Sequence, residues 1–280
     1  MVITQSIFLG VIQGLTEFLP VSSSGHLIFL PEFFGWADQG LAFDVVMHLG
    51  TLLALIIFFR KKLWNILKAV FFLVRKKELE MKDYESKMID CKLGWLIVLS
   101  IIPAGIVGLL FGDWIETSLR SPVVIGVSLI FWGIVLGFAD KYSRRLKIEN
   151  QKSLGMLGWK NVLFIGCAQA VALIPGTSRS GITMTAGLLT KLDKKSVAEF
   201  SFFMSVPVIA LAGFLKIIEL WQNGLGDLSI VVLSIGFLAS ALSGLVAISG
   251  LMKIIQKWSF MPFVVYRVVV GIFIIIVYFL

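Results

Sequence analysis

Cysteine and charged residues are both scarce in this chain of 280 residues. Two cysteines cannot build a disulfide framework, so a small secreted domain held together by disulfides is excluded. Charged residues make up only 15% of the chain, whereas a typical soluble domain has about 25%. Segments of about ten residues that alternate between apolar and polar, as in transmembrane β-strands, are missing. The first 19 residues contain no Lys or Arg, so they lack the basic start of a signal peptide, and we expect them to belong to the fold.

Apolar residues are abundant instead. They make up 58% of the chain and include 23 Phe and 8 Trp, and the mean hydropathy is +0.95. This composition is too apolar for a soluble core and excludes disorder, so we expect an all-α integral membrane protein. The net charge of +8 then concerns membrane topology and lipid headgroups, and no nucleic acid is expected as a partner. About 20 apolar residues cross a bilayer as a helix, and six stretches qualify as transmembrane helices: 41–59, 93–111, 122–139, 200–221, 228–251 and 262–280.

Two further apolar segments, 3–34 and 159–189, are interrupted by small and polar residues. The first break is the sequence PVSSSGH at 20–26, and the second is PGTSRSG at 175–181. Each half-segment is too short for a full crossing of about 20 residues. These segments therefore differ in kind from the six predicted spans.

The positions of Lys and Arg predict the topology. Of 25 such residues, 21 lie in four segments, 60–92, 140–160, 191–199 and 253–262, which should be cytoplasmic because positive loops stay inside. The segment 159–189 is basic on both flanks, so we expect it to enter the membrane and return as a re-entrant helical hairpin. The segment 3–34 has no basic flank and should be a second re-entrant hairpin that enters from the opposite side.

The two interrupted segments are also related in sequence. A shift of 156 residues superposes Gly10 on Gly166, Gln13 on Gln169, and Ser22, Ser24 and Gly25 on Ser178, Ser180 and Gly181. We expect one polytopic domain, 1–280, made of two repeats at about 1–140 and 156–280. Each repeat holds one hairpin and three spans, and this odd number makes the two repeats inverted in the membrane. Inverted repeats with broken helices place a binding site near the bilayer midplane.

The breaks carry the residues of an anion site. Ser22, Ser23, Ser24 and Gly25 begin one half-helix, and Ser178, Arg179, Ser180, Gly181 and Thr183 begin the other. Helix N-termini present free N–H groups and a partial positive charge, and an arginine fork matches phosphate oxygens. Together they predict the binding of a phosphate-like anion.

Ionisable groups at membrane depth are costly and therefore indicate function. Glu17 and His26 flank the first break, and a carboxylate beside an anion requires a bridging cation or a proton-transfer role. Arg267, five residues into its span, is expected to reach the interface or to pair structurally. For His48, both structural packing and catalysis remain open.

At these residues the chain resembles the undecaprenyl-pyrophosphate phosphatase family, the bacitracin-resistance type of bacterial membrane protein. The resemblance rests on GVIQGLTEFLPVSSSGH at 10–26, on PGTSRSGIT at 175–183 and on FDVVMHLGT at 43–51, and it covers nearly the whole chain. Gln13 stands where some members carry a second glutamate. Its neutral carbonyl could still ligate a metal, but Glu17 must then supply the charge.

The resemblance implies that a polyisoprenyl pyrophosphate lipid, undecaprenyl pyrophosphate, is hydrolysed to the monophosphate carrier for peptidoglycan synthesis. It implies a divalent cation, Mg²⁺ or Ca²⁺, which we place at Glu17 and Gln13. It also implies a multi-pass protein of the bacterial cytoplasmic membrane, with a site open to the outer face. The sequence leaves a monomer and a homo-oligomer open as alternatives.

The residues leave the mechanism open. Ser23 is the candidate nucleophile with His26 as its base, since residues three apart on a helix can face the same side. Direct attack by water, activated by Glu17 or His26, is the rival. Arg179 is expected to hold the pyrophosphate. A transporter or flippase of lipid phosphate or a small anion is the alternative function, because broken midplane helices are also a transporter architecture.

Overall fold

The computed structural model describes residues 2–74, 81–146, 148–223 and 229–280. Within these ranges the chain is helical, and the only β-type pairing is an isolated bridge between Lys152 and Leu192. The first half contains α1 (Ile3–Phe18), α2 (Ser23–Phe33), α3 (Gly40–Val74), α4 (Met81–Ser118) and α5 (Pro122–Arg145). The second half contains α6 (Trp159–Val171), α7 (Arg179–Leu189), α8 (Lys194–Asn223), α9 (Ile230–Lys257) and α10 (Met261–Phe279). Two short 3₁₀ turns, Ile148–Asn150 and Leu154–Met156, connect the halves.

Six of the described helices are long and apolar enough to cross a membrane, which confirms the predicted number. They are Gly40–Phe71, Glu85–Ile115, Pro122–Arg145, Lys194–Ile218, Ile230–Lys257 and Met261–Phe279. The predicted start at residue 228 lies outside the described residues. Large apolar side chains are exposed along these helices, and Leu109 is 89% exposed. Such surfaces are unfavourable in water and suit contact with lipid, so this is a multi-pass membrane protein.

Several helices are longer than the sequence predicts. The first span was expected to end at residue 59, yet α3 continues to Val74 after non-helical angles at Phe59 (φ −100°, ψ 18°). The prediction followed the apolar run, and the basic residues beyond Phe59 ended that run without ending the helix. Local signals did identify other boundaries. Ser121 caps α5 by accepting a bond from the Val124 N–H, and Pro122 opens the helix, as is common at helix starts.

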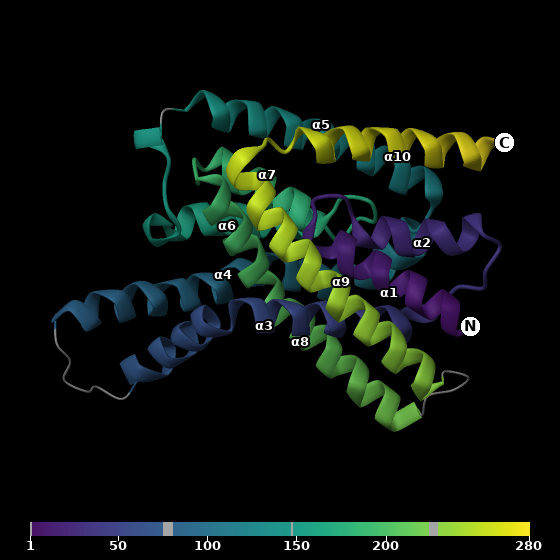
Figure 1. Ribbon diagram of the computed structural model, residues 1–280, viewed down its shortest axis with the longest axis horizontal. Helices are drawn as coiled ribbons and strands as arrows, with labels where there is room; N and C mark the ends of the chain where they lie inside the picture. Colours follow the sequence, from purple (N-terminus) through teal and green to yellow (C-terminus); the bar gives the residue numbers. More distant parts are fainter. Residues whose placement is uncertain (1, 75–80, 147, 224–228) are drawn as a thin grey trace.

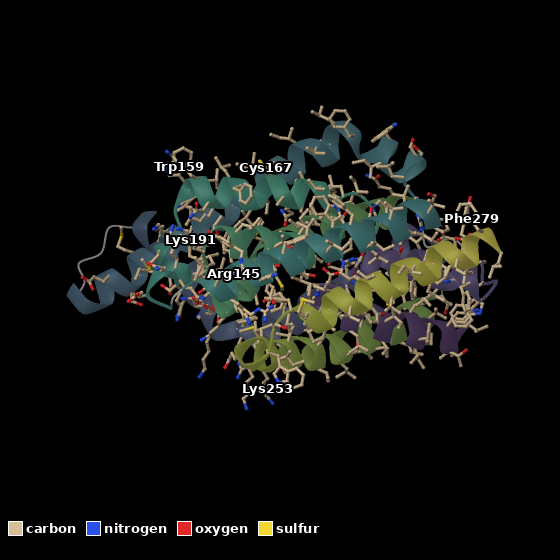
Figure 2. The ribbon with its side chains drawn as sticks, turned by 90° about the horizontal axis from the view of Figure 1, so that it is seen from above. Arg145, Trp159, Cys167, Lys191, Lys253 and Phe279 are labelled. Atoms are coloured by element: carbon tan, nitrogen blue, oxygen red, sulfur yellow. The ribbon has the colours of Figure 1, made fainter. Side chains whose placement is uncertain are left out.

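The broken pairs α1–α2 and α6–α7 lie among the long helices (Figure 1). In that view the labels of both chain ends lie on the right, and α5 and α10 run alongside each other across the top. Figure 2 shows Arg145, Trp159 and Lys191 toward the opposite end of the molecule from Phe279. Each half of the chain thus has the same order of elements, one broken pair followed by three long helices.

Close packing between α1 and α9 depends on small residues. A Cβ at Gly10 would lie 2.5 Å from the Gly236 carbonyl oxygen, and one at Gly14 would overlap Ser243 Oγ and the Ser240 carbonyl oxygen. Small residues let helix backbones approach closely in membranes. The glycine pair in the first signature therefore serves packing and holds α1, with Glu17 near its end, against the rest of the molecule.

We expect Gly14→Ala to lower the thermal unfolding midpoint in detergent, because overpacking a tight contact costs about 1–3 kcal/mol. Gly105→Ala is the matched control, since nothing lies within 4 Å of a Cβ at that position in α4. The control should keep or slightly raise the midpoint, as alanine favours helix over glycine. Equal midpoints for the two variants would contradict the tight α1–α9 contact.

Candidate active site

The first break has an unusual backbone that opens α2. Ser22 is the N-cap of α2 and has φ 76° and ψ 94°, a region that residues other than glycine rarely adopt. Its hydroxyl accepts a bond from the Gly25 N–H at 3.3 Å, and it lies 3.4 Å from Ser24 Oγ. The cap therefore occupies one of the free N–H groups at the helix start and leaves those of Ser23 and Ser24 directed beyond the helix end.

The second break repeats this geometry. Ser178 is the N-cap of α7 with φ 71° and ψ 110°. It accepts a bond from the Gly181 N–H at 3.1 Å, and its hydroxyl lies 3.2 Å from Ser180 Oγ. The residues that superpose in sequence thus make the same contacts, so each break presents one half-helix N-terminus.

The two breaks meet inside the protein. Ser180 Oγ donates to the Leu19 carbonyl oxygen at 2.9 Å, and Arg179 Nη2 lies 2.5 Å from Glu17 Oε1. A cavity of about 230 Å³ lies between them and is lined in part by Glu17, Ser23, Ser178 and Arg179. Residues 162 positions apart therefore share one site.

Glu17 is the centre of the polar contacts in this cavity. Its Oε2 accepts bonds from Ser23 Oγ at 2.7 Å and from Gln13 Nε2 at 3.1 Å. His48 Nε2 is 3.5 Å from the same oxygen, while His48 Nδ1 bonds the Asp44 carbonyl oxygen at 2.7 Å. The Glu17 side chain is only 7% exposed, so these neighbours are what stabilises its charge.

Arg179 retains capacity for an anion. Its Nη1 donates to the Ser201 carbonyl oxygen at 2.9 Å, and Nη2 donates to Glu17. A guanidinium has about five N–H donors, so about three remain. Arg179 can therefore keep Glu17 and still contact a phosphate-like group in the cavity.

The hydrogen bonds of the His26 ring do not go to Ser23. Its Nδ1 lies 2.6 Å from the Ser22 carbonyl oxygen, and its Nε2 lies 2.7 Å from the Tyr266 hydroxyl. Because a carbonyl oxygen only accepts, Nδ1 carries the proton in this bond. In the neutral ring Nε2 then accepts from Tyr266. The spacing suggested that His26 is the hydrogen-bond partner of the Ser23 hydroxyl. In the structure this hydroxyl donates to Glu17 instead.

The candidate residues divide into two groups. Six line the cavity: Glu17, Ser23, Ser24, Ser178, Arg179 and Ser180. The others do not line the cavity but take part in hydrogen bonds around it: Gln13, Ser22, Gly25, His26, Gly181 and Thr183. Thr183, for example, is 1% exposed, and its hydroxyl lies 2.7 Å from Ser201 Oγ, so it fixes α7 against α8.

Sequence reasoning did not select Gln169, Ser201 or Tyr266 for the site. Gln169 lines the cavity and is 3% exposed, and neither of its amide atoms has a hydrogen-bond partner. A buried amide without partners costs about 1–3 kcal/mol, so its position favours a ligand or water that bonds it. The superposition of Gln13 on Gln169 in the repeat was the sequence signal that could have identified Gln169 as a site residue. Arg267 was expected to reach the interface or to pair structurally; it is 0% exposed and bonds backbone carbonyl oxygens, which agrees with the structural alternative.

The residues around Glu17 offer a divalent cation one carboxylate and neutral oxygens. Among the described parts of the chain, no group of three or more His, Cys, Asp or Glu side chains could hold a metal ion. However, Gln13 Oε1 is buried without a partner beside Glu17. One carboxylate with neutral oxygens suits Mg²⁺, which typically takes its other ligands from water and substrate phosphates.

Comparison with known proteins identifies the family of this chain. The sequence model of the bacitracin resistance protein BacA family matches residues 6–273. The chain belongs to the BacA family. It is 46% identical over 274 residues to "Undecaprenyl-diphosphatase 1" of Pseudoalteromonas translucida (strain TAC 125), with 97% of each chain covered. It is 44% identical over 269 residues to "Undecaprenyl-diphosphatase 2" of Stutzerimonas stutzeri (strain A1501), with 95% of each chain covered.

In this BacA-family chain we expect inorganic pyrophosphate to raise the thermal unfolding midpoint, because a ligand that binds only the folded state stabilises it. Arg179→Ala should abolish the increase, and Gln169→Leu should reduce it. Arg60→Ala, at an exposed arginine of α3, is the control and should retain the full increase. The same increase in Arg179→Ala as in the wild type would show that the anion binds elsewhere.

Proposed function

We propose that this chain hydrolyses undecaprenyl pyrophosphate to undecaprenyl phosphate and inorganic phosphate, and so recycles the lipid carrier of peptidoglycan synthesis and gives bacitracin resistance. The observation that carries the proposal is the 2.7 Å bond from the Ser23 hydroxyl to Glu17 in a cavity that Arg179 also lines. A nucleophile beside its base and an anion-binding group are the parts that phosphoryl transfer requires. The names of the BacA-family relatives support the substrate.

Ser23 is the nucleophile of this proposal, and Glu17 is its base. Ser23 Oγ attacks the terminal phosphorus while Glu17 Oε2 takes the hydroxyl proton, so that an O–P bond forms at Ser23. The bond from this phosphorus to the bridging oxygen breaks, and undecaprenyl phosphate leaves with the proton that Glu17 held, which returns Glu17 to its carboxylate form. Water then attacks the phosphoserine, releases phosphate and restores the hydroxyl. Direct attack by a water bound at Glu17 is the competing route.

Arg179 and the two helix starts stabilise the charge that develops. The remaining Arg179 donors and the N–H groups at the starts of α2 and α7 converge on the cavity from both breaks. Such donors are already oriented before the reaction, so little free energy is spent on reorienting them. This preorganisation is a large contribution to the rate enhancement of many enzymes. Gln169 adds an amide that can bond a phosphate oxygen or the attacking water.

His26 supports the first break through its Ser22 and Tyr266 bonds, and in this proposal it orients Ser23 and takes no proton from it. A divalent cation, Mg²⁺ or Ca²⁺, would be held by Glu17 and Gln13. It would neutralise part of the charge of the pyrophosphate.

The substrate chemistry also requires a path for the lipid. A second cavity of about 270 Å³ shares Ser24, His48 and Leu173 with the first and reaches Arg120. Its other lining is largely apolar, with Leu27, Ile28, Leu41, Val45 and Ile115, which suits an isoprenoid chain. Arg120 precedes α5 in a connection that the charge pattern predicts to lie opposite the basic segments, so we propose that the site opens to the outer face of the bacterial cytoplasmic membrane.

The two halves form inverted repeats in this proposal, with α1–α2 and α6–α7 as re-entrant hairpins. The shared order of elements and the matching serine caps support it. An impermeant thiol reagent tests it on cysteine variants in a background without Cys91 and Cys167. Lys160→Cys, in the first turn of α6, and Lys191→Cys, just after α7, should both react only from inside, and Val2→Cys and Asp38→Cys only from outside. Labelling of 160 and 191 from opposite sides would reject re-entrance.

The purified protein should release phosphate from a long-chain isoprenyl pyrophosphate, and a chelator should reduce the rate. Glu17→Gln, Ser23→Ala and Arg179→Ala should each lower kcat by about 100-fold or more, as expected for positioned catalytic groups. Ser249→Ala, whose hydroxyl bonds its own helix on α9, is the control and should be unaffected.

Quenched single turnovers distinguish the routes. A phosphoenzyme that disappears in Ser23→Ala supports covalent catalysis, whereas normal turnover by Ser23→Ala favours water. If folded wild-type protein supplied with metal releases no phosphate, hydrolysis is excluded and transport of a lipid phosphate or small anion becomes the better explanation.

A further inference from the structure

Arg267 of α10 is a fully buried arginine that the hydrolytic mechanism does not use. Its side chain is 0% exposed. No carboxylate of the described residues lies within 4.0 Å of its guanidinium nitrogens. A buried cation without a counterion needs other compensation. In this protein, backbone carbonyl oxygens supply that compensation.

Five backbone carbonyl oxygens surround the guanidinium. Nη1 donates to Pro20 at 3.4 Å, and Nη2 donates to Gly176 at 3.2 Å and to Thr177 at 2.8 Å. On the α5 side, Nη2 donates to Ser128 at 3.4 Å and Nε donates to Leu129 at 3.2 Å. The guanidinium therefore contacts both breaks and one spanning helix at once.

The positions of these carbonyls matter for the site. Pro20 lies two residues before the Ser22 cap, and Gly176 and Thr177 directly precede the Ser178 cap. Buried carbonyl groups in a turn need a donor because no helix supplies one. A planar guanidinium holds its acceptors in a fixed relation that a lysine ammonium does not reproduce.

We propose that Arg267 is the positioning residue that fixes the two breaks relative to each other, and thereby sets Ser23 against Arg179. The neighbouring Tyr266 adds a second tie to the first break, since its hydroxyl bonds His26 and His26 bonds the Ser22 carbonyl oxygen. Two consecutive residues of α10 thus hold the two breaks that carry the anion site.

The consequence for catalysis rests on the proposed function. The nucleophile lies on the first break and the main anion-binding group lies on the second, so a change in their relation affects the reaction more than binding. A misplacement of about 1 Å can cost about 100-fold in rate. Loss of the Arg267 contacts should therefore lower kcat and leave KM nearly unchanged.

Hydrogen exchange tests the positioning without reference to activity. In Arg267→Lys we expect faster exchange in peptides that cover residues 19–24 and 174–180 together, and unchanged exchange in a peptide that covers 93–103 of α4. Arg60→Lys, the same substitution at an exposed site of α3, should change none of them. Unchanged exchange at both breaks, or a change at only one, would overturn the proposal.

Kinetics on the same proteins separate positioning from folding and binding. Arg267→Lys should lose about tenfold or more in kcat per folded molecule, with KM within about threefold of wild type. A normal kcat per folded molecule would mean a purely structural role, and a raised KM with normal kcat would mean substrate binding; either would overturn the proposal. Inactive wild type would refute the hydrolysis, while the exchange result would still test the positioning.

A second variant keeps the test decisive if Arg267→Lys fails to fold. A Cβ at Gly181 would lie 2.6 Å from Arg267 Nη1, the atom that holds Pro20. Gly181→Ala retains the arginine and should displace this atom, so exchange should rise more at residues 19–24 than at 174–180. No rise at 19–24 would count against the proposal.

Discussion

The ion pair between Glu17 and Arg179 is the interaction on which the site depends. It joins the end of α1 to the start of α7, so each broken pair supplies one charge. Both side chains are largely shielded from solvent, so removal of either would leave the other as a costly unpaired charge. The same carboxylate orients Ser23. The pair therefore keeps the proposed nucleophile and the anion-binding arginine at one cavity, and breaking it would destabilise the fold.

At each break, the backbone carbonyl groups and the backbone N–H groups have different partners. Carbonyl groups just before each cap face Arg267, while the N–H groups just after each cap belong to helix starts at the cavity. Non-helical backbone at membrane depth is tolerated only where its polar groups are satisfied. A buried cation satisfies the carbonyls, and in the proposed function the substrate anion meets the N–H groups.

The sequence predicted the type of fold because its signals are local. Apolar runs of about 20 residues identify spans, and the breaks at residues 20–26 and 175–181 interrupt helices as expected. Helix lengths were less predictable. α3 passes Phe59 because its basic continuation is still helical, and hydropathy detects the membrane boundary but not the end of a helix.

The sequence by itself determined the number of spans, the two breaks and most of the polar side chains that line the cavity, since ionisable groups are too costly in a bilayer to occur there without a partner. Only the tertiary structure decided which partners they have. The contacts of His26 with Tyr266 and of Arg267 with both breaks join residues at least 90 positions apart in the chain, and the contact of Ser23 with Glu17 joins two helices across the first break. Spacing along one helix cannot specify such contacts, because they depend on how separate helices pack.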